Sequence, residues 1–189
     1  PADSINRAFE LAQKALTLDA FQADAYALLG NVSLFQREFD KAVQEAEQAI
    51  VLNPNGADHH VWLAMILSAA GRPKEGVDNI NRALRLNPFP PGWYFWSLGD
   101  AYLTLGRYEE AVEAYGKALE RSPDMFFALV GLAAAYAGLG RRGEARTTAS
   151  KILEIDPGFS VDKCTQALPC KNEPDRARLA QALRKAGLK

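Results

Sequence analysis

Residues 92–125 read GWYFWSLGDAYLTLGRYEEAVEAYGKALERSPDM, and this stretch decides the fold. Apolar and small residues recur at helical spacing in both halves, and Gly106 lies between them, where a left-handed residue ends a helix. Pro123 ends the second half, because proline lacks the N–H group that would continue a helix. One such helix pair would leave much of its apolar surface in water. The stretch therefore predicts a helix pair that needs neighbours of its own kind.

The same pattern returns at regular intervals along the chain. Four prolines mark the ends of successive copies, with spacings of 34, 35 and 34 residues: Pro54, Pro88, Pro123 and Pro157. In each copy a leucine is followed by glycine or alanine at one fixed point, and a small residue recurs at another in nearly every copy. Small residues let helices approach closely, while leucines fill the space between them. The period predicts an all-α chain of antiparallel helix pairs.

Eight spaced residues of the 92–125 stretch carry the pattern: Phe95, Leu98, Gly99, Tyr102, Ala111, Tyr115, Ala118 and Pro123. This pattern resembles the tetratricopeptide repeat, which implies a right-handed α-solenoid. The resemblance predicts four complete repeats, numbered 1 to 4 in chain order: 23–56, 57–90, 92–125 and 126–159. A single solenoid over 1–189 is expected, with 1–22 as the second helix of a truncated repeat and 160–189 as a degenerate repeat with a capping helix.

Two departures from the repeat pattern carry structural predictions. Arg37 stands where the other repeats have glycine, so the turn between the helices of repeat 1 must form without one. The final helix carries four basic residues beside an apolar stripe: Arg176, Arg178, Arg184 and Lys185. A solenoid end needs a helix that is polar on its outer side, so we interpret these residues as the solvated face of a cap.

Several classes of function are disfavoured by composition. The formal net charge is −1 over 189 residues, which gives no basic footprint for nucleic acid. The longest uncharged stretch, 125–140, would span roughly 24 Å as a helix, short of the roughly 30 Å that a membrane requires. The sequence holds no phosphate-binding loop and no nucleophile motif with a partner histidine. We therefore expect neither catalysis nor a cofactor.

Histidine and cysteine give no metal-binding pattern. His59 and His60 are adjacent, so on a helix they diverge by about 100° and cannot chelate from one face. We expect both to be surface or half-buried residues. Cys164 and Cys170 are too few for a structural zinc site, and whether they pair with each other is left open.

The resemblance also implies a binding surface. In tetratricopeptide proteins the groove is lined by the second, fifth, ninth, twelfth and thirteenth positions of each repeat, here called groove positions. Twelve residues at these positions are the predicted partner-binding set: Asp24, Ala27, Asn31, Phe35, Asp58, Val61, Met65, Trp93, Trp96, Asp100, Phe127 and Val130. The set is largely apolar with aromatic residues in its middle, which suits an amphipathic helix or an apolar peptide.

Two features of this surface limit its partners. Family members that bind chaperone tails use basic side chains and asparagines, but Ala27, Trp62, Trp93 and Ser97 stand at the corresponding points. No charge pair is therefore available for a terminal carboxylate, and chaperone-tail binding is disfavoured. Trp93 and Trp96 have two open interpretations, since aromatic residues serve both the joint between repeats and a binding surface.

Three functions are compatible with the sequence, and the sequence alone does not decide between them. The first is a non-catalytic scaffold that binds a protein or peptide in its groove. The second follows from a likeness: residues 85–102, 137–141 and 168–188 resemble the C-terminal repeat region of bacterial class III adenylyl cyclases. That likeness implies a regulatory module of a larger signalling enzyme in the cytoplasm. The third is self-association into a homo-oligomer.

Overall fold

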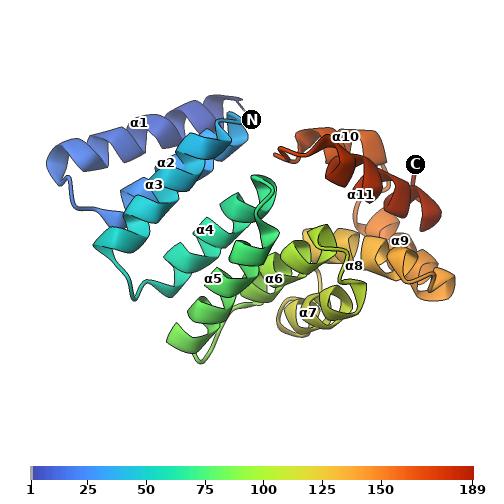
Figure 1. The fold of residues 1–189 in the computed structure, drawn as a ribbon. Coiled ribbons are helices and arrows are strands. Elements are labelled where there is room, and N and C mark those ends of the chain that lie inside the picture. Colours follow the sequence, from blue (N-terminus) through green and yellow to red (C-terminus); the bar gives the residue numbers. More distant parts are fainter. Residues whose placement is uncertain (1) are drawn as a thin grey trace. The chain divides into compact units, whose positions relative to one another are not determined.

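The computed structural model describes residues 2–189, and all secondary structure in that range is helical (Figure 1). The predicted all-α class is therefore confirmed. Pro1, the first residue of the predicted truncated repeat, lies outside the described residues. The described chain forms the following helices: α1 (Ala2–Leu18), α2 (Ala23–Phe35), α3 (Phe39–Leu52), α4 (Ala57–Ala69), α5 (Pro73–Leu86), α6 (Gly92–Thr104), α7 (Tyr108–Arg121), α8 (Phe126–Gly138), α9 (Arg142–Ile155), α10 (Val161–Ala167) and α11 (Glu173–Lys185).

The helices divide into two units. The N-terminal unit runs to Pro88 and holds α1 to α5, and the C-terminal unit begins at Phe89 and holds α6 to α11. In the first unit α2 pairs with α3 and α4 with α5, while α1 packs on α2 and α3 packs on α4. In the second unit α6 pairs with α7 and α8 with α9, and α7 packs on α8. Each predicted repeat thus contains one helix pair.

The two helices of a repeat differ in composition. The first helices, α2, α4, α6 and α8, are apolar around most of their circumference, as expected for helices with neighbours on several sides. In α8, for example, every residue from Ala128 to Ala135 is buried. The second helices alternate a buried small or aliphatic stripe with a charged face. The first helices therefore form the core of each repeat, and the second helices separate it from solvent.

The turns between paired helices use the left-handed backbone conformation. Gly71, Gly106 and Gly140 have φ angles of 85°, 73° and 73°. In repeat 1 the same position is Arg37, which adopts a φ of 63°. The turn predicted to form without glycine therefore keeps the glycine geometry. A side chain in this region costs on the order of 1 kcal/mol, because Cβ approaches the carbonyl oxygen.

Tyr115 joins three helices of the C-terminal unit. The residue is fully buried on α7. A Cβ built on Gly99 of α6 would lie 2.6 Å from its ring, and one on Gly131 of α8 would lie 2.2 Å from it. Both distances are shorter than real contacts, so the ring lies directly against the backbone of both helices. Glycine at these two points makes room for the tyrosine.

The chain changes direction after repeat 4. Ser160 caps α10 by accepting a hydrogen bond from the Lys163 amide, as its position before the helix predicts. α11 then packs on α8 and on α10. Its residues Ala180 and Leu183 belong to the same buried cluster as Val130 and Ala134 of α8. The end of the chain is therefore part of the core of the C-terminal unit.

Candidate functional site

In the N-terminal unit the predicted binding residues range from open to fully buried. Phe35, at the end of α2, is 54% exposed. Asp58 is exposed, and Met65 is half-buried. Ala27 and Val61 are buried in the core, so their side chains offer no surface in this conformation.

Asp24 connects repeat 1 to repeat 2. Its carboxylate lies 2.8 Å from Nε2 of His59, and its side chain is 96% exposed while that of His59 is 7% exposed. His60 lies 3.0 Å from both the Asn79 side-chain oxygen and the Pro54 carbonyl oxygen. The expectation of surface or half-buried histidines is therefore wrong. Each buried ring has a polar partner within the unit, but Nδ1 of His59 is buried without a hydrogen bond.

Asn31 is also used inside the fold. Its side-chain amide donates to the Ala27 carbonyl one turn earlier in α2, at 2.9 Å. The residue is half-buried. Its amide oxygen and its second N–H are the groups of this side chain that a ligand could use.

In the C-terminal unit the aromatic groove positions form a cluster. The rings of Trp96 and Phe127 are 6.1 Å apart, and Phe127 is 53% exposed. Phe126 packs edge-on against Phe127 and also contacts Phe159. Trp93 packs edge-on against buried Tyr94, with ring centres 4.7 Å apart. Trp96 and Phe127 thus present an aromatic surface from two successive repeats.

Asp100 lies at a groove position, but its carboxylate is bonded to Tyr115 of the neighbouring helix α7. Its carboxylate accepts a hydrogen bond from the Tyr115 hydroxyl at 2.5 Å. Burial raises the pKa of Asp100 to about 7, and the bond from Tyr115 opposes this shift. The pKa of Tyr115 is raised well above its usual value by burial and by the neighbouring carboxylate. Near neutral pH this carboxyl group is therefore divided between its protonated and ionised forms.

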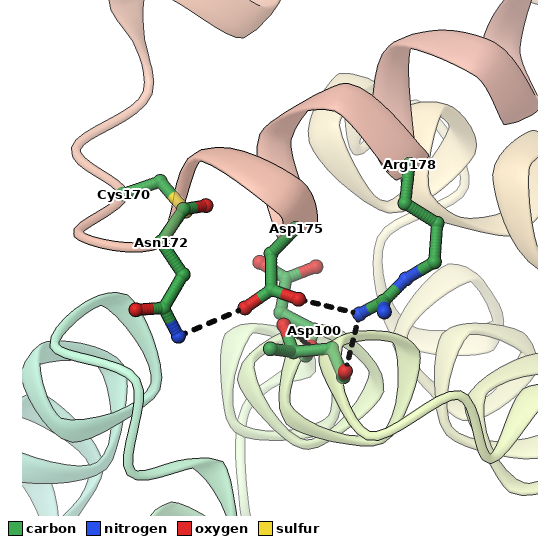
Figure 2. A network of polar contacts seen from close by, with 6 residues as sticks. Asp100, Cys170, Asn172, Asp175 and Arg178 are labelled. Atoms are coloured by element: carbon green, nitrogen blue, oxygen red, sulfur yellow. Dashed lines mark hydrogen bonds and ion pairs between the residues drawn. The ribbon is translucent and has the colours of Figure 1, made fainter.

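Three of the five groove positions of repeat 4, at residues 130, 134 and 137, are covered by the chain itself. Val130 is 5% exposed and, with Ala134 and Ala137, belongs to the cluster that includes the apolar stripe of α11. Arg178 of α11 donates from Nη2 to the Thr104 carbonyl at the end of α6, at 2.6 Å. Figure 2 shows this guanidinium between α6 and the carboxylate of Asp175, which Asn172 also contacts. A surface predicted to meet a partner is here occupied by α11.

The basic residues of α11 are therefore more than a solvated face. Arg178 reaches α6, and Arg184 donates to Asp162 of α10 at 2.5 Å. Arg176 pairs with Glu173 within α11. The sequence did show the apolar stripe and the basic side chains. Periodicity alone could not show that the helix turns back onto α8.

The described residues hold no group of three His, Cys, Asp or Glu residues that could bind a metal ion. Cys164 and Cys170 are free thiols, and burial raises the pKa of Cys164. Among the described helices, none combines the length and apolar character that crossing a membrane would take.

Comparison with known families agrees with this architecture. The tetratricopeptide-repeat profile matches residues 27–91 and 97–158. The chain belongs to the tetratricopeptide-repeat family. Proteins of this family are generally non-catalytic scaffolds for interactions between proteins.

Two relatives cover much of the chain. The small glutamine-rich tetratricopeptide repeat-containing protein 2 of Mycosarcoma maydis is 32% identical over 116 residues, which are 61% of this chain and 33% of that protein. Superkiller complex protein 3 of Mus musculus is 32% identical over 156 residues, which are 82% of this chain and 10% of that protein. The chain therefore spans a third of the length of the first relative and a tenth of the second.

Solved tetratricopeptide structures share the fold. PilW, a type IV pilus biogenesis factor, has a TM-score of 0.76 at 19% identity and covers 98% of this chain and 84% of its own. YrrB, described as a TPR protein with an unusual peptide-binding site, has a TM-score of 0.61 at 22% identity and covers 93% and 90%. These identities show the fold alone. The relatives give no support to the likeness to adenylyl cyclases.

Proposed function

We propose that this chain is a protein-interaction module whose groove positions bind a peptide or an amphipathic helix. The aromatic surface of the C-terminal unit carries the proposal. The rings of Trp96 and Phe127 lie 6.1 Å apart at groove positions of two successive repeats, and Phe127 keeps 53% of its surface exposed. Aromatic residues are enriched among those that dominate binding energy, because they bury large areas at low entropic cost.

YrrB, which has the same fold, is described as having an unusual peptide-binding site, so the fold is compatible with peptide binding. The partner chemistry follows from the surface itself. Exposed Phe127 and half-buried Trp96 offer apolar area within the C-terminal unit, so the partner is expected to be apolar or amphipathic. Self-association and a role within a larger signalling enzyme have no observation that favours them.

The proposal is tested with a peptide selected from a displayed library against the whole chain. Its dissociation constant is measured by fluorescence anisotropy for the unmodified chain and for Trp96→Ala and Phe127→Ala. We expect each variant to bind at least about tenfold more weakly, the usual effect of removing a central aromatic contact.

Leu153→Ala is the matched control, since Leu153 is 39% exposed but lies on the second helix α9. It should bind as the unmodified chain does. Circular dichroism of all variants should remain helical. Equal affinity for the two aromatic variants and the control would refute the proposed function.

A further inference from the structure

α11 occupies groove positions of two successive repeats. It packs on α8, whose Val130 and Ala134 share a buried cluster with Leu183 of α11. Its Arg178 also donates to the carbonyl of Thr104, the thirteenth position of repeat 3. α11 thus contacts both first helices of the C-terminal unit, α6 and α8.

This placement differs from that of a further repeat. The first helix of repeat 4, α8, packs on both α6 and α7, the two helices of the repeat before it. α11 instead packs mainly on α8 and α10, and its guanidinium bond reaches back to α6. α11 therefore lies over the first helices, as a groove ligand would, rather than on the end of the stack.

The attachments of α11 combine a short apolar stripe with exposed polar bonds. Leu183, Ala186 and Leu188 are almost fully buried, and Ala180 is 8% exposed. The Val161 amide of α10 also donates to the Lys189 carbonyl at 2.7 Å. The ion pairs Arg178–Asp175 and Arg184–Asp162 are both partly exposed to solvent, and such pairs stabilise little. The helix pairs of repeats 3 and 4 pack on each other through α7, α8 and Tyr115 without α11. Repeats 3 and 4 therefore have contacts of their own that do not involve α11.

We propose that α11 is a displaceable resident of the groove, and that the partner is an amphipathic helix of the same chemistry. Such a helix carries leucine and alanine on one face, and a guanidinium one to two turns from the leucine for the Thr104 carbonyl. The face of α8 accepts this pattern because alanines at positions 133, 134 and 137 leave room for a leucine. The inference rests on the proposed function, since it names the helix chemistry and the control of access at the same groove.

The test uses the full chain and a fluorescein-labelled synthetic peptide of residues 172–189. Binding is followed by anisotropy for the unmodified chain, for Arg178→Ala and for Leu183→Ala. Weakening the resident helix raises the fraction of open groove, and apparent affinity rises with that fraction. We expect the dissociation constant to fall about threefold for Arg178→Ala and at least tenfold for Leu183→Ala. Leu153→Ala should match the unmodified chain, and a peptide carrying Leu183→Asp should not bind.

Each outcome bears on the inference. A permanent cap predicts no gain in peptide binding for either variant, and that result overturns the inference. Should Leu183→Ala lose its helical dichroism, Arg178→Ala still decides, because its bond lies at the exposed edge. Dimers in light scattering that the peptide fails to dissociate would assign the face to a second copy and overturn it. The proposed function is refuted by a separate result, namely that Trp96→Ala and Phe127→Ala leave the dissociation constant of the library peptide unchanged.

Discussion

The two units pack the same repeat in different ways. At one position of the second helix, repeat 2 has Ile80 and repeat 3 has Tyr115, and both are fully buried. Isoleucine brings no polar atom into the core. Tyrosine brings a hydroxyl that must be bonded, and Asp100 accepts from it. Its ring also needs glycine at two points on neighbouring helices, Gly99 and Gly131. The tyrosine side chain thus accounts for the residue type at three other positions, Asp100, Gly99 and Gly131.

The largest expected effect breaks this arrangement at Gly131. In Gly131→Ala the new Cβ would lie 2.2 Å from the Tyr115 ring, which has no free space to move into. We expect the free energy of unfolding to fall by about 2 kcal/mol, within the range for overpacked cores. Repeats 1 and 2 have Leu28 and Trp62 at this position, so they have no such requirement.

Gly116→Ala is the matched control on α7, because a Cβ there has nothing within 4 Å. It should raise stability by about 0.5 to 1 kcal/mol through helix propensity. Urea unfolding followed by circular dichroism measures both variants. If Gly131→Ala were as stable as Gly116→Ala, the Tyr115 ring could move away from the new methyl group, and the inferred close packing would be wrong.

A smaller effect concerns the carboxylate that the tyrosine requires. Asp100 has a folded-state pKa of about 7, above its ordinary value of 3.8. Its contribution to stability is therefore fully present below pH 4 and is lost as the pH rises through 7. Asp100→Asn keeps an acceptor for Tyr115 without this loss. The full shift would correspond to about 4 kcal/mol, and solvent screening of this half-buried carboxylate reduces it. We expect the variant to be about 1 kcal/mol more stable than the unmodified chain at pH 8, and no more stable at pH 4.

Measuring the difference between the two proteins from pH 4 to pH 8 separates Asp100 from the other carboxylates, which both proteins share. Most of the change should fall between pH 4 and pH 7. A difference that does not vary with pH would mean that the carboxyl group is solvated in the folded state.

The smallest effect compares the turns. Arg37 of the N-terminal unit and Gly106 of the C-terminal unit share the left-handed conformation, with φ angles of 63° and 73°. Arg37→Gly should raise stability by about 0.5 kcal/mol, since relief of strain exceeds the added freedom of the unfolded chain. Gly106→Ala should lower it by about 0.5 kcal/mol, because a Cβ there meets no atom and the strain exceeds the freedom that the unfolded chain loses. Thermal unfolding would show opposite shifts, and shifts of the same sign would contradict this account.

Much of the fold could be predicted from the sequence because it is periodic. Four prolines at spacings of 34, 35 and 34 residues fix the repeat, and helix pairs follow from the small residues and leucines within it. The left-handed turns followed from glycine in three repeats, and Arg37 was recognised as the exception. These features are local, so the sequence around each position contains the information.

The candidate site was less predictable because it depends on contacts between distant residues. The repeat pattern predicts which helix face carries a residue. It does not predict that Asp100 bonds to Tyr115, 15 residues later, instead of facing a partner. His59 is buried because Asp24, 35 residues away, bonds its ring. Val130 is covered because α11 returns across it. Each of these long-range contacts depends on the particular residues at distant positions, so the repeat pattern could not predict it.

The position of Tyr115 also affects how the molecule unfolds. In most repeat arrays each repeat has its own stability, and neighbours separate one interface at a time. Here the ring that completes the core of repeat 3 also fills the joint with repeat 4 through Gly131. Opening that joint exposes the tyrosine and leaves the core of repeat 3 incomplete. We therefore expect repeats 3 and 4 to open together rather than one after the other.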